Sequence, residues 1–168
     1  MSQNMLAEIF SLSAKLLKTA TEQGQTIATA ESCTGGLIGA AITSAPGSST
    51  AFRGGIIAYH NDIKIEQLAV DPAIIAEFGA VSGPVAEQMA SGCLNKLGVD
   101  IAVSVTGVAG PGGGSAEKPV GTVWMGVATR QGVYSAKHFF DGMDRNKVRD
   151  HTCLAALKAL LAELDQTS

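Results

Sequence analysis

A strand that runs through a short turn directly into a helix is the feature that most restricts how this chain can fold. Residues 25–30 favour a β-strand, and residues 37–42 are spaced as a helix. The turn between them has the sequence Glu31-Ser32-Cys33-Thr34-Gly35-Gly36. Unpaired backbone N–H groups and the positive end of the dipole at a helix start favour negative charge. The turn can therefore hold a nucleophile beside oxyanion donors, or it can be a simple capped helix start, because Ser and Thr are preferred caps.

Strand-like and helix-like segments alternate along most of the remaining chain. Helices are predicted at residues 5–22, after Thr34, from Asn61, at 72–78, over 81–97 and at 145–164. Strands are predicted at residues 54–59, 100–105, 120–129 and 132–140, and the last two pair through a tight turn. This order predicts one domain over residues 1–168, a three-layer α/β/α sandwich. Its sheet is expected to be mixed and mostly parallel, with about five strands, one of them antiparallel.

The composition argues against several classes of protein. A net charge of −3 and scattered aromatic side chains argue against a nucleic-acid partner. No apolar run reaches the roughly 18 residues that a membrane span needs. Three widely spaced cysteines, Cys33, Cys93 and Cys153, argue against a disulfide framework and a zinc site, and they favour the reducing cytoplasm. With 46% hydrophobic and 16% charged residues, the chain is expected to form a homodimer or a larger homo-oligomer.

Three of the predicted strands end in residues that can carry chemistry. The first strand is followed by Ser32, Cys33 and Thr34. The second ends at Tyr59 and is followed by Asn61, with Lys64 one helical turn beyond. The third carries Ser104 and Thr106 and leads into a glycine-rich run, residues 107–114. In an open α/β sheet, ligands bind outside the carboxyl ends of the strands. The three groups are therefore predicted to meet at one edge of the sheet.

Two features suit an anionic ligand. The glycine-rich run has backbone N–H groups that no side chain obstructs. It is not a nucleotide-binding P-loop or a dinucleotide fingerprint, because neither a Gly-Lys-Ser/Thr sequence nor a helix follows it, and its composition fits a mobile surface loop equally well. Arg145 and Arg149 lie four residues apart on one predicted helix face, where they either pair with Asp141 or Asp144 or recognise phosphate or carboxylate.

The other candidate side chains also have two interpretations each. Lys64 is either a solvated helix lysine or a desolvated amine that serves as a general base. Tyr59 either packs against its neighbours or orients Ser32 or Lys64. Cys33 is a candidate thiolate nucleophile, but none of the three histidines is an obvious partner for it.

Together and in this order, these segments resemble the CinA C-terminal domain family. The matching stretches are residues 29–36, 54–59 with Asn61 and Lys64, 79–82, 104–111 with 113–114, 118–123, and 144–145 with Arg149. The resemblance extends from residue 5 to residue 164. The combination is specific, although each piece alone is weak.

The resemblance implies a nicotinamide-nucleotide amidase, which hydrolyses the carboxamide of nicotinamide mononucleotide (NMN) to nicotinate mononucleotide and ammonia without a metal or a cofactor. It implies Ser32 as the nucleophile and Lys64 as the general base, with Tyr59 in support. The implied substrate-binding residues are Cys33, Thr34, Gly35, Asn61, Thr106, Gly107, Gly110, Gly113 and Arg145. N–H groups near Cys33 to Gly35 are expected to receive the oxyanion.

The chain departs from the family pattern at His60, where a small residue is usual, and at Gly83-Pro84, where acidic residues are usual. Larger relatives carry an additional N-terminal domain, for which this chain has no room, so activities of that domain are expected to be absent. Two other hypotheses remain. One is a non-catalytic nucleotide-binding or regulatory module of the competence-damage-inducible type, and the other is an amidase for a different small amide.

Overall fold

The structure is a computed structural model that describes residues 2–166. Its helices are α1 (Gln3–Glu22), α2 (Leu37–Thr43), α3 (Asn61–Leu68), α4 (Pro72–Phe78), α5 (Gly83–Leu97) and α6 (Arg145–Gln166), with a short 3-10 turn, η1, at Ser48–Thr50. Its strands are β1 (Ile27–Glu31), β2 (Phe52–Ile57), β3 (Ile101–Gly107), β4 (Thr122–Thr129) and β5 (Gly132–Phe139). No helix in this range is long and apolar enough to cross a membrane.

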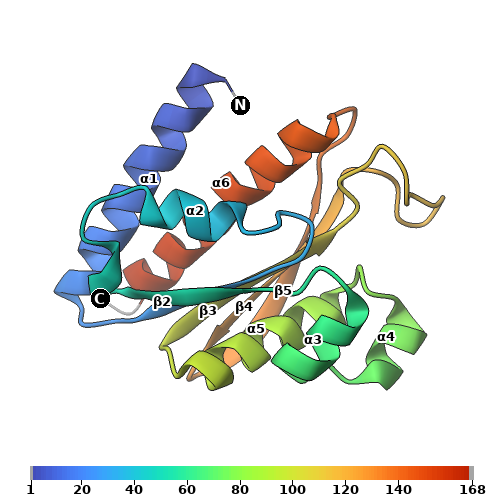
Figure 1. Ribbon diagram of the computed structural model, residues 1–168, viewed down its shortest axis with the longest axis horizontal. Coiled ribbons are helices and arrows are strands. Elements are labelled where there is room, and N and C mark those ends of the chain that lie inside the picture. The colour runs from blue at the N-terminus through green and yellow to red at the C-terminus, as the bar shows by residue number, and fades with distance from the viewer. Residues whose placement is uncertain (1, 167–168) are drawn as a thin grey trace.

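The five strands form one mixed sheet in the order β2-β1-β3-β4-β5 (Figure 1). Strand β1 pairs in parallel with both β2 and β3, and β4 is antiparallel to its neighbours β3 and β5. The predicted α/β fold is therefore confirmed, including the single strand that runs against the others.

Helices cover both faces of the sheet (Figure 1), with α1, α2 and α6 on one face and α3, α4 and α5 on the other. Because successive strand residues point to opposite faces, β3 contributes Ile101 and Val103 to the core under α1 and α6. Ala102, between them, belongs to the second core, under α3 and α5. Both faces of the central strands are therefore buried.

The strand boundaries differ from the predicted ones by one or two residues, and the difference at β2 bears on the site. Strand β2 spans Phe52–Ile57 instead of 54–59, so Tyr59 lies beyond the strand, in the turn that leads to α3. Position 55 of this strand is occupied by glycine, because a Cβ there would lie 2.3 Å from the hydroxyl of Thr29 on the neighbouring strand. Strand β4 begins at Thr122 instead of at residue 120, because the N–H of Gly121 bonds the carbonyl of Val108 and closes the glycine-rich loop.

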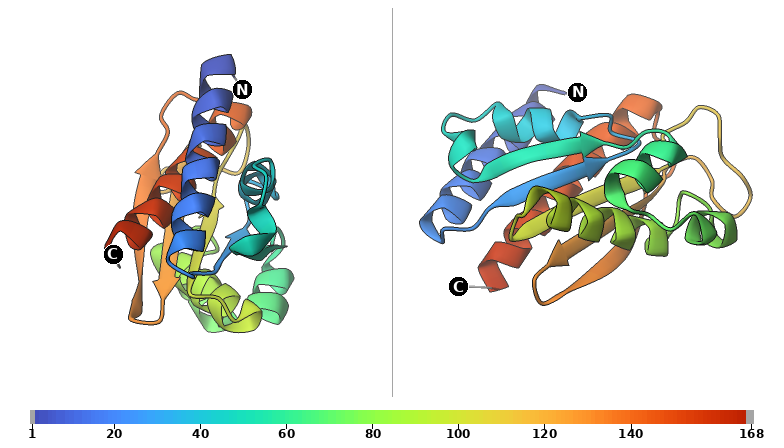
Figure 2. Two further views of the ribbon diagram at one scale, coloured as in Figure 1. Left: turned by 90° about the vertical axis from the view of Figure 1, so that its left-hand side faces the viewer. Right: turned by 60° about the horizontal axis from the view of Figure 1, so that its bottom comes forward.

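The register of the parallel strands brings their carboxyl ends together. Glu31, the last residue of β1, lies opposite Ile57 of β2 and Val105 of β3. The glycine-rich loop extends beyond this same edge, where the starts of α3 and α6 also lie (Figure 2). Segments from four parts of the chain therefore meet at one end of the sheet.

Candidate functional site

A cavity of about 290 Å³ opens at the carboxyl edge of the parallel strands. All of the predicted site residues line it except Thr34 and Gly35; the lining contains Ser32, Cys33, Tyr59, Asn61, Lys64, Thr106, Gly107, Gly110, Gly113 and Arg145. The convergence expected from the sheet topology is therefore present. Thr34 is fully buried behind the turn, and Gly35 has a left-handed backbone with φ of 62°.

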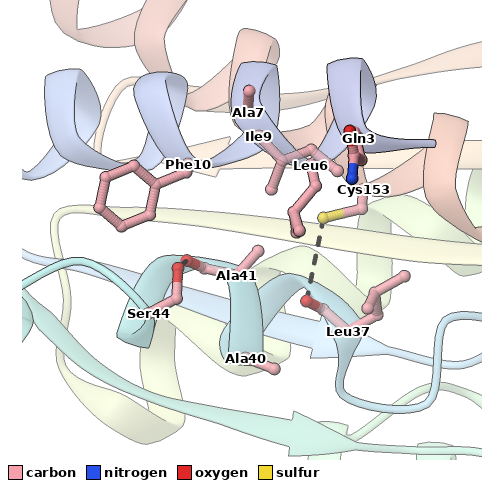
Figure 3. Close-up of a pocket in the computed structure, with 10 residues that line it drawn as sticks. All are labelled: Gln3, Leu6, Ala7, Ile9, Phe10, Leu37, Ala40, Ala41, Ser44 and Cys153. Atoms are coloured by element: carbon pink, nitrogen blue, oxygen red, sulfur yellow. Dashed lines mark hydrogen bonds between the residues drawn. The ribbon is translucent and has the colours of Figure 1, made fainter. Parts of the chain in front are cut away.

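A larger cavity of about 560 Å³ lies elsewhere, between α1 and α2 (Figure 3). Its wall is mostly apolar, and it includes Phe10 and Leu6 of α1, of which Leu6 projects toward Ala41 of α2. The thiol of Cys153 at its end bonds the carbonyl of Leu37. The smaller cavity is the candidate functional site, because it combines a hydroxyl, an amine, a guanidinium and backbone amides.

Ser32 is held by its backbone and has a free side chain. Its N–H donates to the carbonyl of Val105 at 3.0 Å, and its own carbonyl accepts from the N–H of Gly35 at 3.1 Å. Within residues 2–166, no protein group bonds its hydroxyl. Ser32 therefore presents an uncommitted hydroxyl to the cavity from a fixed backbone.

Glu31 shapes the turn, and the sequence reasoning missed it. Its carboxylate is 2% exposed and accepts five hydrogen bonds, from the hydroxyls of Thr29 and Thr34 and from the N–H groups of Gly36, Ile38 and Gly39. The sequence feature that could have indicated this role is an acidic residue at the start of the turn, within reach of the first amides of the following helix.

These contacts change which amides can receive an oxyanion. At the start of α2, Glu31 accepts from the N–H groups of Gly36, Ile38 and Gly39, and the N–H of Leu37 bonds the carbonyl of Thr34. The N–H of Gly35 bonds the carbonyl of Ser32. In the described part of the chain, no other residue accepts a hydrogen bond from the N–H groups of Cys33 and Thr34. The expected donor set of residues 33–35 is therefore reduced to two.

Lys64 is buried, which argues against the solvated-lysine interpretation. The residue is 2% exposed, on the first turns of α3, and its ammonium donates to the carbonyl of Tyr59 at 3.3 Å. No carboxylate of the described residues pairs with it. Burial lowers the pKa of this amine, against a smaller opposing effect from Cys33. A lysine in such surroundings can serve as a neutral base.

Cys33 is poorly suited to be a thiolate. Burial raises the pKa of its thiol to about 12, and its own backbone N–H only partly offsets this. The thiol is therefore neutral near pH 7, and the thiolate is the reactive form of cysteine. Of the two neighbouring nucleophile candidates, the structure favours the hydroxyl of Ser32.

Tyr59 acts on Lys64 through its carbonyl and not through its phenol. The side chain is well exposed, and its hydroxyl accepts from Arg145 at 2.9 Å. Arg145 also donates to the carbonyl of Gly110 at 2.7 Å. One arginine therefore links the turn before α3 to the glycine-rich loop across the cavity.

The second arginine of this helix holds the turn after β1. Arg149 donates to the carbonyl of Thr34 from Nη2 at 2.8 Å. The alternative interpretation was that the arginines pair with Asp141 or Asp144. Among the described residues, Asp144 pairs instead with Lys147 at 3.3 Å, and the arginines donate to Gly110, Tyr59 and Thr34.

The remaining predicted residues form the walls. The Thr106 hydroxyl donates to the carbonyl of Ala80 at 2.8 Å, so it ties β3 to the connection before α5. Asn61 is the first residue of α3, whose start is capped by the side chain of His60, with Nδ1 accepting from the N–H of Asp62 at 3.4 Å. The family departure at His60 therefore supports the helix that carries Lys64.

The glycine-rich loop is anchored at its base. The N–H of Val108 bonds the carbonyl of Thr122, and the N–H of Ser115 bonds the carbonyl of Lys118. Gly110 and Gly113 have φ of 83° and 82°, and a Cβ at Gly110 would lie 2.5 Å from Val120. Across residues 109–114, the structure gives no acceptor to the backbone N–H groups. Those of the cavity-lining glycines are available to an anion.

The described residues hold no group of three His, Cys, Asp or Glu side chains that could bind a metal ion.

Comparison with known proteins gives a consistent result. The family model for the CinA C-terminal domain matches residues 9–164. A CinA-like protein of Chlorobaculum tepidum is 49% identical over 86% of this chain and 35% of its own length. A putative competence-damage inducible protein of Halothermothrix orenii is 54% identical over 83% of this chain and 34% of its own length. The chain thus spans about a third of these curated relatives.

Solved structures agree with the fold over nearly the whole chain. The competence/damage inducible protein CihA from Agrobacterium tumefaciens superposes with a TM-score of 0.91 at 42% identity, over 94% of this chain and 96% of that one. A competence damage-inducible protein A from Klebsiella pneumoniae gives 0.89 at 32% identity, over 94% and 97% of the two chains.

Proposed function

The chain belongs to the CinA C-terminal domain family, and from the chemistry of its cavity we propose that it hydrolyses the carboxamide of NMN to nicotinate mononucleotide and ammonia. One observation carries this proposal. The free hydroxyl of Ser32 and the buried amine of Lys64, which has no counter-ion in the described chain, line the same cavity. A hydroxyl and a neutral amine are the parts that metal-independent amide hydrolysis needs.

In the proposed mechanism, Oγ of Ser32 attacks the carboxamide carbon and its proton passes to Nζ of Lys64. The N–H groups of Cys33 and Thr34 stabilise the tetrahedral oxyanion. When the C–N bond breaks, the Lys64 ammonium gives its proton to the departing amine, which leaves as ammonia. The same amine then takes a proton from water, and the hydroxide attacks the ester on Ser32. As the ester C–O bond breaks, the Lys64 ammonium returns the proton to Oγ of Ser32 and the acid is released.

The rest of the cavity suits a mononucleotide. Its volume of about 290 Å³ lies just below the range of about 300–1,000 Å³ for small-molecule sites, which favours a mononucleotide over a dinucleotide. Arg145 has further N–H donors beyond those that Gly110 and Tyr59 accept, and glycines of the loop line the same cavity. We assign phosphate recognition to this arginine and these amides.

The test is ammonia release from NMN by the purified wild type, Ser32→Ala and Lys64→Ala, with and without a chelator. The wild type is expected to release ammonia in both conditions, and each variant is expected to lose at least about 10²-fold in kcat. The matched control is Cys33→Ala, one residue from the nucleophile, which should keep most of the activity. Loss confined to Cys33→Ala would move the nucleophile to the thiol. Full activity in Lys64→Ala would reject the base.

A second candidate is a nucleotide-binding module without catalysis. It is favoured by the absence of any hydrogen bond between the Ser32 hydroxyl and the Lys64 amine in the described chain. Calorimetric binding of NMN without ammonia release would support this module. A panel of NMN, nicotinamide riboside and nicotinamide separates the amidase for NMN from an amidase for another amide, because only NMN carries the phosphate.

A further inference from the structure

We propose that Glu31 is a positioning residue that orients the Ser32 turn for oxyanion stabilisation, a role that rests on the proposed function. Its Oε2 accepts from the Thr34 hydroxyl at 2.7 Å, from the N–H of Gly36 at 3.0 Å and from the N–H of Ile38 at 3.1 Å. Its Oε1 accepts from the N–H of Gly39 at 2.8 Å and from the Thr29 hydroxyl at 3.3 Å. One carboxylate therefore binds both the turn and the start of α2.

The first consequence concerns the amides of α2. At an ordinary helix start these N–H groups are unpaired and attract an anion. Here Glu31 occupies those of Gly36, Ile38 and Gly39 from inside the protein. The helix start cannot bind the oxyanion, and the N–H groups of Cys33 and Thr34 are the donors that the turn leaves available.

The second consequence concerns the orientation of Thr34. Its hydroxyl is held by Glu31, and its carbonyl is held by Nη2 of Arg149 at 2.8 Å. The residue is thus fixed from two sides, by β1 and by α6. An amide donor contributes to catalysis only if it already points at the developing charge. The two bonds hold the side chain and the carbonyl of Thr34, so they restrict rotation of the backbone about this residue and thereby limit the direction of its N–H.

The third consequence concerns charge. Within the described residues no cation pairs with Glu31, so its negative charge is balanced by backbone amides and hydroxyls alone. A carboxylate this close to the nucleophile would oppose a developing anion if its charge were not offset. The five donors provide that offset, and Glu31 can therefore stand directly beside Ser32.

The test is Glu31→Gln, which keeps the size of the side chain and one acceptor oxygen. Because both carboxylate oxygens only accept, either orientation of the glutamine turns its NH₂ group toward donors of the turn or of α2. We expect kcat for NMN to fall by about 10²-fold, as for a lost oxyanion donor, with KM within about twofold because the cavity wall is unchanged.

A matched pair of variants separates positioning from general stability. Thr34→Val and Thr29→Val each remove one hydroxyl bond to the same carboxylate, but only Thr34 belongs to the turn. Thr34→Val should lower kcat by about tenfold, and Thr29→Val should keep it within about twofold. Asp100→Asn is the stability control, since Asp100 accepts from Thr26 at the far end of the sheet. It should lower Tm and keep kcat.

The reactivity of Ser32 can also be measured without NMN, with a fluorophosphonate that labels a reactive serine by forming an O–P bond as fluoride leaves. Mass spectrometry should show Ser32 labelled in the wild type and at least tenfold more slowly in Glu31→Gln. If the wild type is labelled but releases no ammonia from NMN, the proposed function fails while the role of Glu31 is still decided by the labelling rates. Equal labelling in folded Glu31→Gln, equal kcat losses in the two threonine variants, or no labelling of the wild type would overturn the proposal.

Discussion

Replacing Lys64 with methionine is expected to remove most of the activity and, at the same time, to stabilise the fold. The lysine is 2% exposed, and its single hydrogen bond in the described chain goes to the carbonyl of Tyr59 at 3.3 Å. An ammonium has three donors, so the fold leaves this one poorly satisfied and without a counter-ion. Methionine fills a similar space with an unbranched apolar chain and removes the charge.

The two effects can be sized separately. Loss of a general base costs about 10²–10⁴-fold in kcat, or about 3–5 kcal/mol of barrier. Relief of buried, poorly satisfied N–H donors is worth about 1–3 kcal/mol of stability. For a chain of 168 residues this is a rise in Tm of about 2–12 °C, at about 2–4 °C per kcal/mol. Activity and stability therefore move in opposite directions.

The stability gain also depends on pH in a defined direction. Burial lowers the folded-state pKa of Lys64 from its ordinary 10.5, so between the two values the unfolded chain binds more protons than the fold. Wild-type stability therefore rises with pH through this window. The advantage of Lys64→Met is fully present below the folded pKa and shrinks as the pH approaches about 10.5. In the wild type, kcat/KM should rise with pH up to that same folded pKa, because only the neutral amine is a base.

The assay is ammonia release with thermal unfolding at several pH values, on wild type, Lys64→Met and Lys96→Met. Lys96 is the matched control, because it is an exposed helix lysine that bonds Gln67 at 2.8 Å. Lys96→Met should change neither kcat nor the slope of Tm against pH. A Lys64→Met protein with wild-type turnover would contradict the role of Lys64 as the base, and one less stable than the wild type at neutral pH would contradict the cost of burying its ammonium.

Three other changes test the remaining contacts. Iodoacetamide at pH 8 should alkylate Cys33 far more slowly in the native protein than in the unfolded one, since burial raises the pKa of its thiol to about 12. Rapid alkylation of the native protein would contradict the conclusion that this thiol is neutral. Arg145→Met should raise KM for NMN by about tenfold or more and leave KM for nicotinamide riboside unchanged, measured by ammonia release; equal effects on both would remove the phosphate contact. Tyr59→Phe should raise KM for NMN more weakly than Arg145→Met and should keep kcat, because the phenol of Tyr59 bonds Arg145 whereas its carbonyl holds Lys64. A loss of kcat as large as that of Lys64→Met would show that the phenol takes part in catalysis.

Much of the fold and the location of the site could be read from local patterns. The short apolar run along β3 and the helical spacing along α5 are short-range properties, so the order of elements and the mixed sheet were predictable. The meeting of Ser32, Lys64 and the glycine-rich loop followed from one rule, that parallel strands end at a common edge. These predictions required no knowledge of side-chain contacts.

The roles of individual side chains were decided only by the tertiary structure. Tyr59 and Arg145 are 86 positions apart, and Arg149 and Thr34 are 115 apart, so no local pattern could show that they bond. The burial of Lys64 without a counter-ion depends on what α3 packs against. The selection of Cys33 and Thr34 as available donors depends on how the five bonds of Glu31 are distributed. The periodicity of the sequence determined which segments form helices and strands and where they end, because this periodicity reflects the geometry of a helix or a strand. The hydrogen-bond partners depended on distances between segments, which exist only once the layers have packed.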